Sequence, residues 1–263
     1  MNVKTALTIG GSDPSGAAGV QADLKVFAAL RLHGMSVITA LTSQNSTRVS
    51  EVMRVSDKTV SHQFKAIHED LPIDALKIGM LASTENIGMV AQLIEEAKLK
   101  NIVLDPVFLS SSGAHLIEKG GVEAMVKLLF PLVDIVTPNI DEASLLSGLN
   151  IETPGDMKEA ARMIKEMGPA YVFVKGGHLK GRAIDILYDG ISFLTLDAPR
   201  ITDREFRGTG CALSAAIASG LAKGMDMKSS AEKAKDFVAR SIKTGYEDLG
   251  RGMGILNHNH PML

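Results

Sequence analysis

Short apolar runs alternate with longer amphipathic segments along most of the chain. In residues 84–98 the apolar positions recur every three or four residues, which predicts a helix with one buried face. The apolar runs end at glycine, aspartate or a polar turn, as buried strands commonly do. They predict strands at residues 3–9, 37–41, 51–55, 74–79, 102–104, 133–136 and 171–174. Helices are predicted at residues 19–33, 57–70, 84–98, 121–130, 139–148, 154–168, from 208 onward, and 229–244.

The repeated order of strand and helix predicts a mostly parallel sheet with helices on both faces, an α/β fold of three layers. Two short strands within residues 37–55 precede any further long helix, so we expect a small β flap beside the sheet. Residues 183–188 and 191–196 flank Asp189-Gly190, which predicts a hairpin. No repeat, linker or low-complexity segment divides the chain, so residues 1–263 are expected to form one domain.

The composition narrows the classes of partner. The net charge is −2, only 4% of the residues are aromatic and the basic residues form no stripe, so nucleic acid is not an expected partner. The N-terminus runs into an apolar strand without a signal peptide, and no apolar run approaches the roughly 18 residues of a membrane span. A single cysteine excludes an internal disulfide framework and suits a reducing compartment. We therefore expect a cytoplasmic protein.

Ligands of such sheets bind beyond the carboxyl ends of the parallel strands. The residues that stand out from the apolar pattern collect at the predicted strand ends. They are Gly10-Gly11, Gly79-Met80, Asp105-Pro106, Thr137-Pro-Asn139, Lys175-Gly-Gly-His178 and Gly208-Thr-Gly-Cys211. The sequence therefore places its candidate chemistry at one edge of the sheet.

The last of these stretches, Gly208-Thr209-Gly210-Cys211, leads from polar residues into a helix of small side chains. Its glycines permit a tight turn, and the first amides of the helix lack intrahelical acceptors. Free amides at the positive end of a helix dipole bind anions. Cys211 lies in this turn, where a thiol is expected to ionise more readily than a free one. The alternative is a plain glycine-rich turn with a buried, inert thiol.

Acidic and basic side chains follow the neighbouring strands. Asp105 ends an apolar strand, where a carboxylate needs a partner. Asn139 and Glu142 are three residues apart and so face the same way on a helix. Oxygen ligands of this kind suit Mg²⁺, and Lys175 is placed to neutralise a phosphate. The alternatives are compensation of the helix dipole for Glu142 and a solvated surface position for Lys175.

An anion cradle, acids for a metal and a lysine together indicate phosphoryl transfer, which depends on positioning and charge neutralisation. The glycine-rich loop predicted at residues 10–19 has neither the Walker A pattern nor the dinucleotide-binding pattern, so dinucleotide binding is not expected. The pattern of residues 42–47 predicts a surface turn. The histidines of residues 257–261 suggest a metal site, but a surface tail is the expected structure.

Seven segments, in order along nearly the whole chain, resemble the hydroxymethylpyrimidine/phosphomethylpyrimidine kinases of thiamine biosynthesis, in the ribokinase-like superfamily. Each segment alone is a modest signal, whereas the ordered set is specific. The segments are residues 7–23, 38–45, 77–81, 103–107, 137–143, 174–178 and 208–216.

The resemblance implies a ribokinase-like three-layer αβα fold and an ATP- and Mg²⁺-dependent kinase. Its substrate would be 4-amino-5-hydroxymethyl-2-methylpyrimidine and then the monophosphate of that pyrimidine. Gln44 would hydrogen-bond the pyrimidine edge, which changes the interpretation of residues 42–47 from a turn to part of a substrate site. The remaining pyrimidine contacts that the resemblance implies are Gly11, Asp23, Met80 and Val107.

For ATP and Mg²⁺ the resemblance implies a second set of residues. Asp105 and Glu142 would hold the metal, and Asn139 and Lys175 would contact the nucleotide phosphates. The turn formed by Gly208, Thr209, Gly210 and Cys211 would be the anion hole, and the Cys211 thiolate could accept the hydroxymethyl proton. Many relatives in the superfamily carry aspartate as the base at this position.

The chain departs from the family pattern at two places. Arg207 stands where a histidine is expected, and its charge could reach a phosphate. Ser110-Ser-Ser-Gly113 replaces a variant of that loop that carries lysine. Two alternative functions stay open, a pyridoxal or pyridoxine kinase and a non-catalytic ligand sensor that kept the fold. The open edges of the flap strands suggest a homodimer.

Overall fold

The computed structural model describes residues 3–108, 116–177, 179, 181–202 and 204–260. Within these residues a nine-stranded sheet has the order β3-β2-β1-β4-β5-β6-β7-β8-β9. The strands from β2 to β7 in this order are parallel, whereas β3, β8 and β9 are antiparallel to their neighbours. The strands are β1 Thr5–Ser12, β2 His33–Gln44, β3 Val49–Arg54, β4 Leu76–Ile78, β5 Ile102–Leu104, β6 Ile135–Val136, β7 Tyr171–Val174, β8 Ala183–Tyr188 and β9 Phe193–Ala198.

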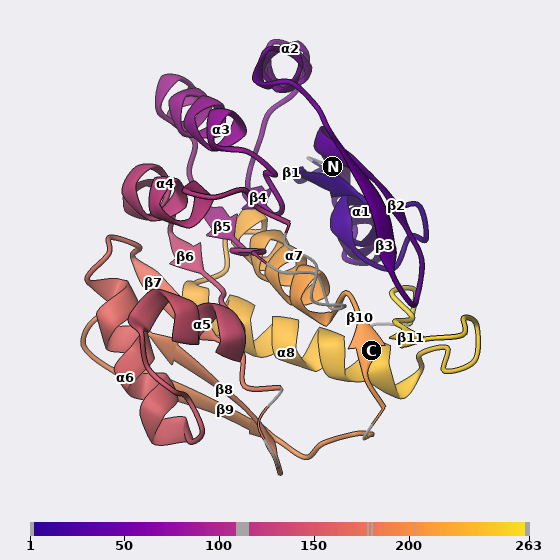
Figure 1. Cartoon of the computed structure of the whole chain (residues 1–263), viewed down its shortest axis with the longest axis vertical. Coiled ribbons are helices and arrows are strands. Elements are labelled where there is room, and N and C mark those ends of the chain that lie inside the picture. The colour runs from indigo at the N-terminus through magenta and orange to yellow at the C-terminus, as the bar shows by residue number, and fades with distance from the viewer. Residues whose placement is uncertain (1–2, 109–115, 178, 180, 203, 261–263) are drawn as a thin grey trace.

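Helices cover both faces of this sheet, so the predicted three-layer αβα architecture is confirmed (Figure 1). One face carries α1 Gly19–Ala29, α7 Thr209–Ala222 and α8 Met227–Lys243. The other face carries α2 Asp57–His68, α3 Thr84–Ala97, α4 Gly121–Leu128, α5 Ile140–Ser147 and α6 Pro154–Lys165. The 3₁₀ turn Phe130–Leu132 follows α4 and packs on the same face of the sheet. No helix of the described ranges has the length and apolarity that crossing a bilayer requires.

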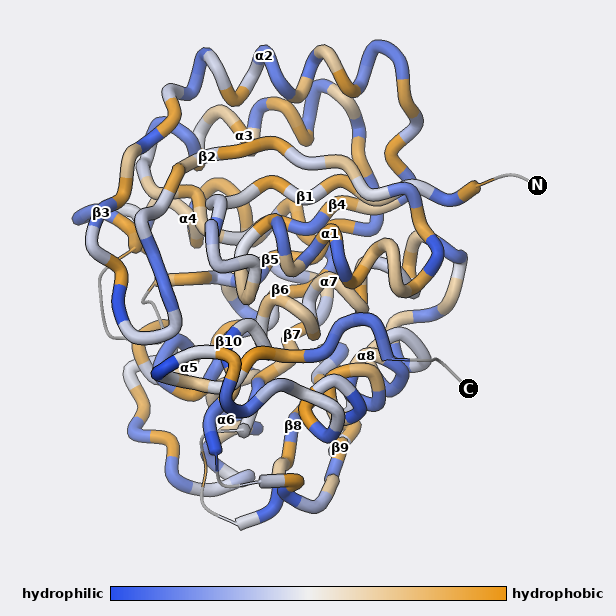
Figure 2. The backbone as a smooth tube through the Cα atoms, turned by 90° about the vertical axis from the view of Figure 1, so that its right-hand side faces the viewer, coloured by the Kyte–Doolittle hydropathy of each residue, from blue (hydrophilic) through white to orange (hydrophobic). Residues whose placement is uncertain are grey.

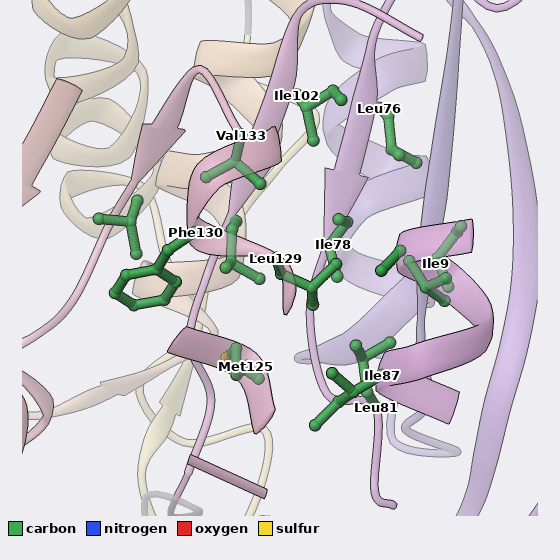
Figure 3. Close-up of a cluster of buried hydrophobic side chains, with 14 of the residues drawn as sticks. Ile9, Leu76, Ile78, Leu81, Ile87, Ile102, Met125, Leu129, Phe130 and Val133 are labelled. Carbon is green, nitrogen blue, oxygen red and sulfur yellow. The ribbon is translucent and has the colours of Figure 1, made fainter. Parts of the chain in front are cut away.

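Strand residues alternate between the two layers of the core. Leu76 and Ile78 of β4 belong to the same buried cluster as Ile87 of α3 and Met125 of α4, and Figure 3 shows part of this cluster. The residues between such positions, for example Val103 of β5, pack against α1, α7 and α8 instead. This alternation follows from the two-residue period of a strand and decides which side chains can reach α7.

Local sequence signals fix several helix ends. Thr153 caps α6 by accepting the N–H of Asp156, and Pro154 takes the first helical position, as predicted. Gly148, with φ of 74°, ends α5 in the left-handed conformation. The amphipathic pattern of α2 is visible in Figure 2 as alternating hydrophilic and hydrophobic stretches, and its buried side includes Val60 and Phe64.

The first strand is longer than its sequence pattern suggests. The predicted loop begins at Gly10, but β1 continues through Gly11 and Ser12, which pair with Ala40 and Leu41 of β2 across a bulge. β2 in turn extends to Gln44, so the turn expected at residues 42–47 starts as a strand. These pairings continue because the long β2 offers hydrogen-bond partners to a glycine segment that has little strand preference of its own.

The flap is the antiparallel pair formed by the end of β2 and β3. Its tip lies beside a short parallel pair that the sequence did not predict, β10 Phe206–Arg207 and β11 Gly254–Ile255 (Figure 1). Ser46 at the tip contacts Gly252, because its hydroxyl accepts the Gly252 N–H at 3.2 Å. The C-terminal segment therefore connects the flap to the strand that leads into α7.

The histidines of the C-terminal segment are buried, so the expected surface tail is wrong. His258 is 3% exposed and His260 is 5% exposed. The His260 ring packs against the Phe237 ring of α8 with centroids 4.7 Å apart and the planes tilted by 46°, and its Nε2 lies 3.1 Å from Ser241 Oγ. The C-terminal segment is polar in composition, but packing against α8 buries it.

Candidate active site

A cavity of about 2120 Å³ opens at the carboxyl ends of the parallel strands. This volume exceeds the roughly 300–1,000 Å³ of a pocket for one small ligand, so the cavity has room for two. All of the candidate site residues line it. They are Gly11, Asp23, Gln44, Met80, Asp105, Val107, Asn139, Glu142, Lys175, Gly208, Thr209, Gly210 and Cys211.

The predicted anion turn begins α7. Gly208 is the N-cap residue with φ of 78°, and a Cβ at this position would overlap the Ala17 carbonyl oxygen of the β1–α1 loop. A glycine is therefore required both by the left-handed backbone and by the close approach. Gly208 supplies no side-chain cap, which leaves the first amides of α7 directed at the cavity end of the helix.

Lys175 lies between the two predicted metal acids. Its Nζ is 2.6 Å from Asp105 Oδ1 and 4.0 Å from Glu142 Oε2, and both acids are buried. A Cβ added at Gly210 would lie 3.0 Å from the same Nζ, so the lysine also adjoins the anion turn. Lys175 is thus not the solvated surface lysine of the alternative interpretation.

Asn139 and Glu142 form a capping box at the start of α5. Asn139 Oδ1 accepts the Glu142 N–H at 2.9 Å, and Glu142 Oε2 accepts the Asn139 N–H at 2.7 Å. Glu142 therefore stabilises the start of α5 and also lines the cavity. Burial raises the pKa of Glu142 to about 7; Lys175 opposes this shift and Asp105 adds to it.

The acids fit a metal that is held jointly with phosphates. No group of three or more histidine, cysteine or acidic side chains in the described ranges could hold an ion by itself. Mg²⁺ usually takes one or two carboxylates together with substrate phosphates and water. Asp105 and Glu142, gathered around one lysine, provide such a donor set.

Cys211 lies in the first turn of α7 and is partly exposed. Burial raises the pKa of its thiol to about 11; Lys77 opposes this shift, and the charges of Asp23 and Asp105 add to it. The expectation that this thiol ionises readily is therefore wrong for the protein without its ligands. Desolvation and two nearby carboxylates outweigh the effect of the helix terminus.

The opposite wall of the cavity is apolar and belongs to the flap side. Met80 packs in a small cluster with Ala40 of β2, and Val107 and Val52 adjoin that cluster. A Cβ at Gly11 would come within 3.0 Å of the Met80 sulfur, so this wall leaves no space above the glycine for a side chain. Gln44 ends β2 beside this wall with a partly exposed side chain.

Asp23 has a buried partner that the sequence pattern did not predict. Asp23 is fully buried, and its Oδ2 accepts hydrogen bonds from Thr8 Oγ1 at 2.7 Å and from Lys77 Nζ at 2.8 Å. Lys77 is only 1% exposed. The signal for it was a lysine in the middle of the apolar strand Ala75-Leu-Lys-Ile78, where a charge needs a buried partner.

Arg207, which replaces the expected histidine, is engaged with the protein. Its Nη1 donates to the Asn45 carbonyl oxygen at 2.6 Å, and its Nη2 lies 3.6 Å from Asp13 Oδ2. These contacts join the anion turn to the flap and to the β1–α1 loop. The other departure from the family pattern, Ser110-Ser-Ser-Gly113, lies outside the described residues.

Comparisons with known proteins agree with this geometry. A family model described as phosphomethylpyrimidine kinase matches residues 13–257. The hydroxymethylpyrimidine/phosphomethylpyrimidine kinase of Aquifex aeolicus is 43% identical over 96% of the chain and 99% of its own length. The thiamine biosynthesis bifunctional protein ThiED of Geobacter sulfurreducens is also 43% identical over 96% of the chain, which spans about half (51%) of that longer protein.

A solved structure extends the comparison to a nucleotide complex. The ADP complex of Bacillus subtilis pyridoxal kinase superimposes with a TM-score of 0.90 at 37% identity, covering 98% of both chains. The same arrangement of layers therefore occurs in a kinase that binds a nucleotide.

Proposed function

Because the chain belongs to the phosphomethylpyrimidine kinase family, we propose that it is the ATP-dependent kinase that phosphorylates 4-amino-5-hydroxymethyl-2-methylpyrimidine in thiamine biosynthesis. The product monophosphate is then phosphorylated to the diphosphate. The observation that carries the proposal is the single cavity that holds the anion turn, the Lys175–Asp105–Glu142 cluster and the apolar wall beside Gln44.

The cluster around Lys175 is the proposed nucleotide side. Lys175, Asn139 and the amides at Gly208 and Gly210 bind phosphate oxygens, and these donors stabilise the charge on the transferring group. Asp105 and Glu142 are the residues that would hold Mg²⁺, which when bound neutralises charge on the phosphates. The position of Lys175 between both acids supports this assignment, because it keeps the two carboxylates together before ligands arrive.

The flap wall is the proposed acceptor side. The side-chain amide of Gln44 hydrogen-bonds the pyrimidine edge, and Met80 and Val107 pack against the ring above Gly11. The hydroxymethyl oxygen then faces the first turn of α7, where the thiolate form of Cys211 accepts its proton as the oxygen attacks the terminal phosphorus of ATP and ADP leaves. The small residues of the β1–α1 loop leave space for a phosphate in the second reaction.

The direct test is to incubate the purified protein with ATP, Mg²⁺ and the hydroxymethylpyrimidine and to follow the release of ADP. Mass spectrometry should detect the monophosphate first and the diphosphate later. If neither product forms while the protein is folded, the proposal is wrong.

Pyridoxal kinase is the second candidate function, because the chain is similar in structure to the pyridoxal kinase of Bacillus subtilis. Pyridoxal also presents a hydroxymethyl group on a six-membered heteroaromatic ring. The ratio of kcat/KM for the pyrimidine to kcat/KM for pyridoxal decides between the two, and we expect this ratio to exceed one.

The flap also supports the proposal of a homodimer. β3 is an edge strand, and the cross-strand neighbours Leu41 and Met53 are 43% and 54% exposed. An exposed apolar pair on an edge strand is a typical association surface. Light scattering should give the mass of a dimer for the wild type and a smaller mass for Met53→Lys; a wild-type monomer would contradict the proposal.

A further inference from the structure

Lys77 is a charged residue in an apolar layer. Its neighbours in β4, Leu76 and Ile78, point into the core on the α2–α4 side. Strand alternation therefore directs Lys77 to the opposite face, which it shares with apolar strand residues such as Val103 and Phe173 and with Thr8 of β1, which also bonds Asp23. This face is the one covered by α1 and by the first turn of α7.

The Lys77 ammonium group is held by Asp23 of α1. Nζ lies 2.8 Å from Asp23 Oδ2, and the other carboxylate oxygen, Oδ1, is buried without a hydrogen-bond partner. A Cβ added at Gly79 would lie 2.9 Å from Nζ, so the ammonium group reaches the strand exit at the base of the cavity. Burying both ions is costly, and apolar residues in their place are often neutral or stabilising. A contribution to stability alone therefore does not explain the pair.

Cys211 lies at the same end of the cavity. The charged groups that act on its thiol are Lys77 from β4, Asp23 from α1, Asp105 from the end of β5 and Lys175 from the end of β7. The backbone N–H of Gly19 also favours the thiolate. Lys77 and Lys175 are the cations among these groups, and Lys77 has the largest effect in favour of the thiolate. Although burial alone would lower it, the pKa of Lys77 is raised because Asp23, Cys211 and Asp105 all favour the ammonium form.

We propose that Lys77, fixed by Asp23, is a positioning residue whose buried positive charge stabilises the thiolate of Cys211. The inference rests on the proposed function only in the role given to that thiolate. In the transfer step the alcohol O–H bond breaks and its proton forms an S–H bond with the Cys211 thiolate. The alcohol oxygen forms the new bond to the terminal phosphorus of ATP as the bond from that phosphorus to its bridging oxygen breaks, and ADP leaves with the electron pair of the broken bond. Lys77 remains protonated and Asp23 remains ionised throughout.

The chain's single cysteine gives a direct test, because alkylation by iodoacetamide reports on Cys211 alone. The thiolate is the reactive form, so the alkylation rate at a fixed pH measures its fraction. In Lys77→Met we expect the rate near pH 8 to fall about tenfold or more, whereas Lys77→Arg should keep a rate near that of the wild type. The curves should converge at high pH if only ionisation has changed.

Lys235→Met is the matched control. Lys235 is another partly buried lysine that pairs with a carboxylate, Asp185, at 2.6 Å. Its loss should leave the alkylation curve unchanged. An unchanged curve in folded Lys77→Met, checked by circular dichroism, would overturn the proposal.

A double variant keeps the test valid if Lys77→Met does not fold. Lys77→Met with Asp23→Asn leaves no uncompensated charge in the core. Because Lys77 affects the thiol more than Asp23 does, the double variant should still be alkylated more slowly than the wild type, though faster than Lys77→Met. A rate equal to or above that of the wild type would contradict the proposal.

Kinetics separate this inference from the proposed function. Lys77→Met should lower kcat for the pyrimidine and leave KM for ATP nearly unchanged, and the lost rate should be partly regained at higher pH. If the protein phosphorylates a different alcohol, the alkylation results still decide the role of Lys77. If the pyrimidine is phosphorylated but alkylation does not respond to Lys77, only the present inference is wrong.

Discussion

At the scale of single residues, two lysine–carboxylate pairs lie near the first turn of α7. Lys175 with Asp105 lies on the proposed nucleotide side, and Lys77 with Asp23 lies on the α1 side. Cys211 is placed among charges of both signs, and its protonation depends on burial and on the balance of these charges rather than on the helix terminus alone. The ligands of a kinase are charged, so we expect their binding to change the protonation of the Cys211 thiol.

Replacing Cys211 by alanine should lower kcat about a hundredfold or more, because a positioned general base contributes roughly 10²–10⁴ to the rate. KM for the pyrimidine should change little, since the apolar wall stays intact. With a thiol pKa of about 11, the thiolate fraction rises about tenfold per pH unit through the neutral range. The wild-type rate should therefore increase with pH, and Cys211→Ala should lose this increase in steady-state measurements.

Gln44→Ala is the contrasting variant, because Gln44 lies on the flap side of the cavity. It should raise KM for the pyrimidine and keep the pH dependence of the wild type. If Cys211→Ala retains a nearly wild-type rate, the amides of the anion turn carry the catalysis and the thiol only packs.

The start of α5 illustrates how one element serves both stability and function. Asn139→Ala removes the capping box and should lower the free energy of unfolding by about 1 kcal/mol, while Asn139→Asp keeps an N-cap acceptor and should restore it. Both variants should raise KM for ATP, because the proposed amide contact to phosphate is lost in each. Urea unfolding and initial-rate kinetics provide the two measurements.

Thr153→Ala is the matched control for α5. It removes the capping box of α6, which begins the next helix along the chain. Its unfolding free energy should fall by a similar amount, about 1 kcal/mol, with KM for ATP unchanged. If Asn139→Asp binds ATP as the wild type does, Asn139 acts only as a helix cap.

Arg207 links two elements that meet at the cavity, β10 and the flap. In Arg207→Met the Asn45 carbonyl oxygen loses its donor, and the residue next to Gln44 is no longer held. KM for the pyrimidine should rise severalfold and KM for ATP should stay constant. Arg204→Met is the control, because Arg204 pairs with the exposed Asp248 on the surface. Equal effects of both variants on KM for the pyrimidine would contradict this role of Arg207.

At the scale of the whole molecule, the sequence predicted the structural features that are determined by neighbouring residues in the chain. The order of strand and helix predicted the layers, and Thr153-Pro154 predicted the start of α6. The features it missed depend on partners distant in the chain. Lys77 finds Asp23 across 54 residues, and β1 continues past Gly10 because β2 pairs with it. No local pattern contains such a partner.

The candidate site, too, could be predicted from the sequence only in part. The residue types at the strand ends predicted which side chains share a cavity, because parallel strands bring their carboxyl ends together. The ionisation of those side chains could not be predicted in this way. The readily ionised thiol expected at Cys211 was wrong because burial and the carboxylates of Asp23 and Asp105 act on it, and these appear only in the folded chain.

The buried C-terminal segment predicts how the stability of the whole molecule depends on pH. Burial lowers the pKa of His258 to about 4, and Lys25 and His260 add to this shift. Between that value and the ordinary pKa of about 6.5, the unfolded chain binds a proton that the folded chain does not. Stability from this group is therefore fully present above about pH 6.5 and is lost as the pH falls toward 4. The loss should reach about 2 kcal/mol by pH 5.

Urea unfolding of the wild type and of His258→Gln at neutral pH and near pH 5 measures this contribution. The variant should be less sensitive to the change of pH by about 2 kcal/mol, whatever its stability at neutral pH, because glutamine does not titrate. His62→Gln serves as the control, since the exposed His62 on α2 should leave the pH dependence unchanged. If the wild type and His258→Gln lose equal stability on acidification, His258 is protonated without cost, and the C-terminal segment does not stay packed against α8 in solution.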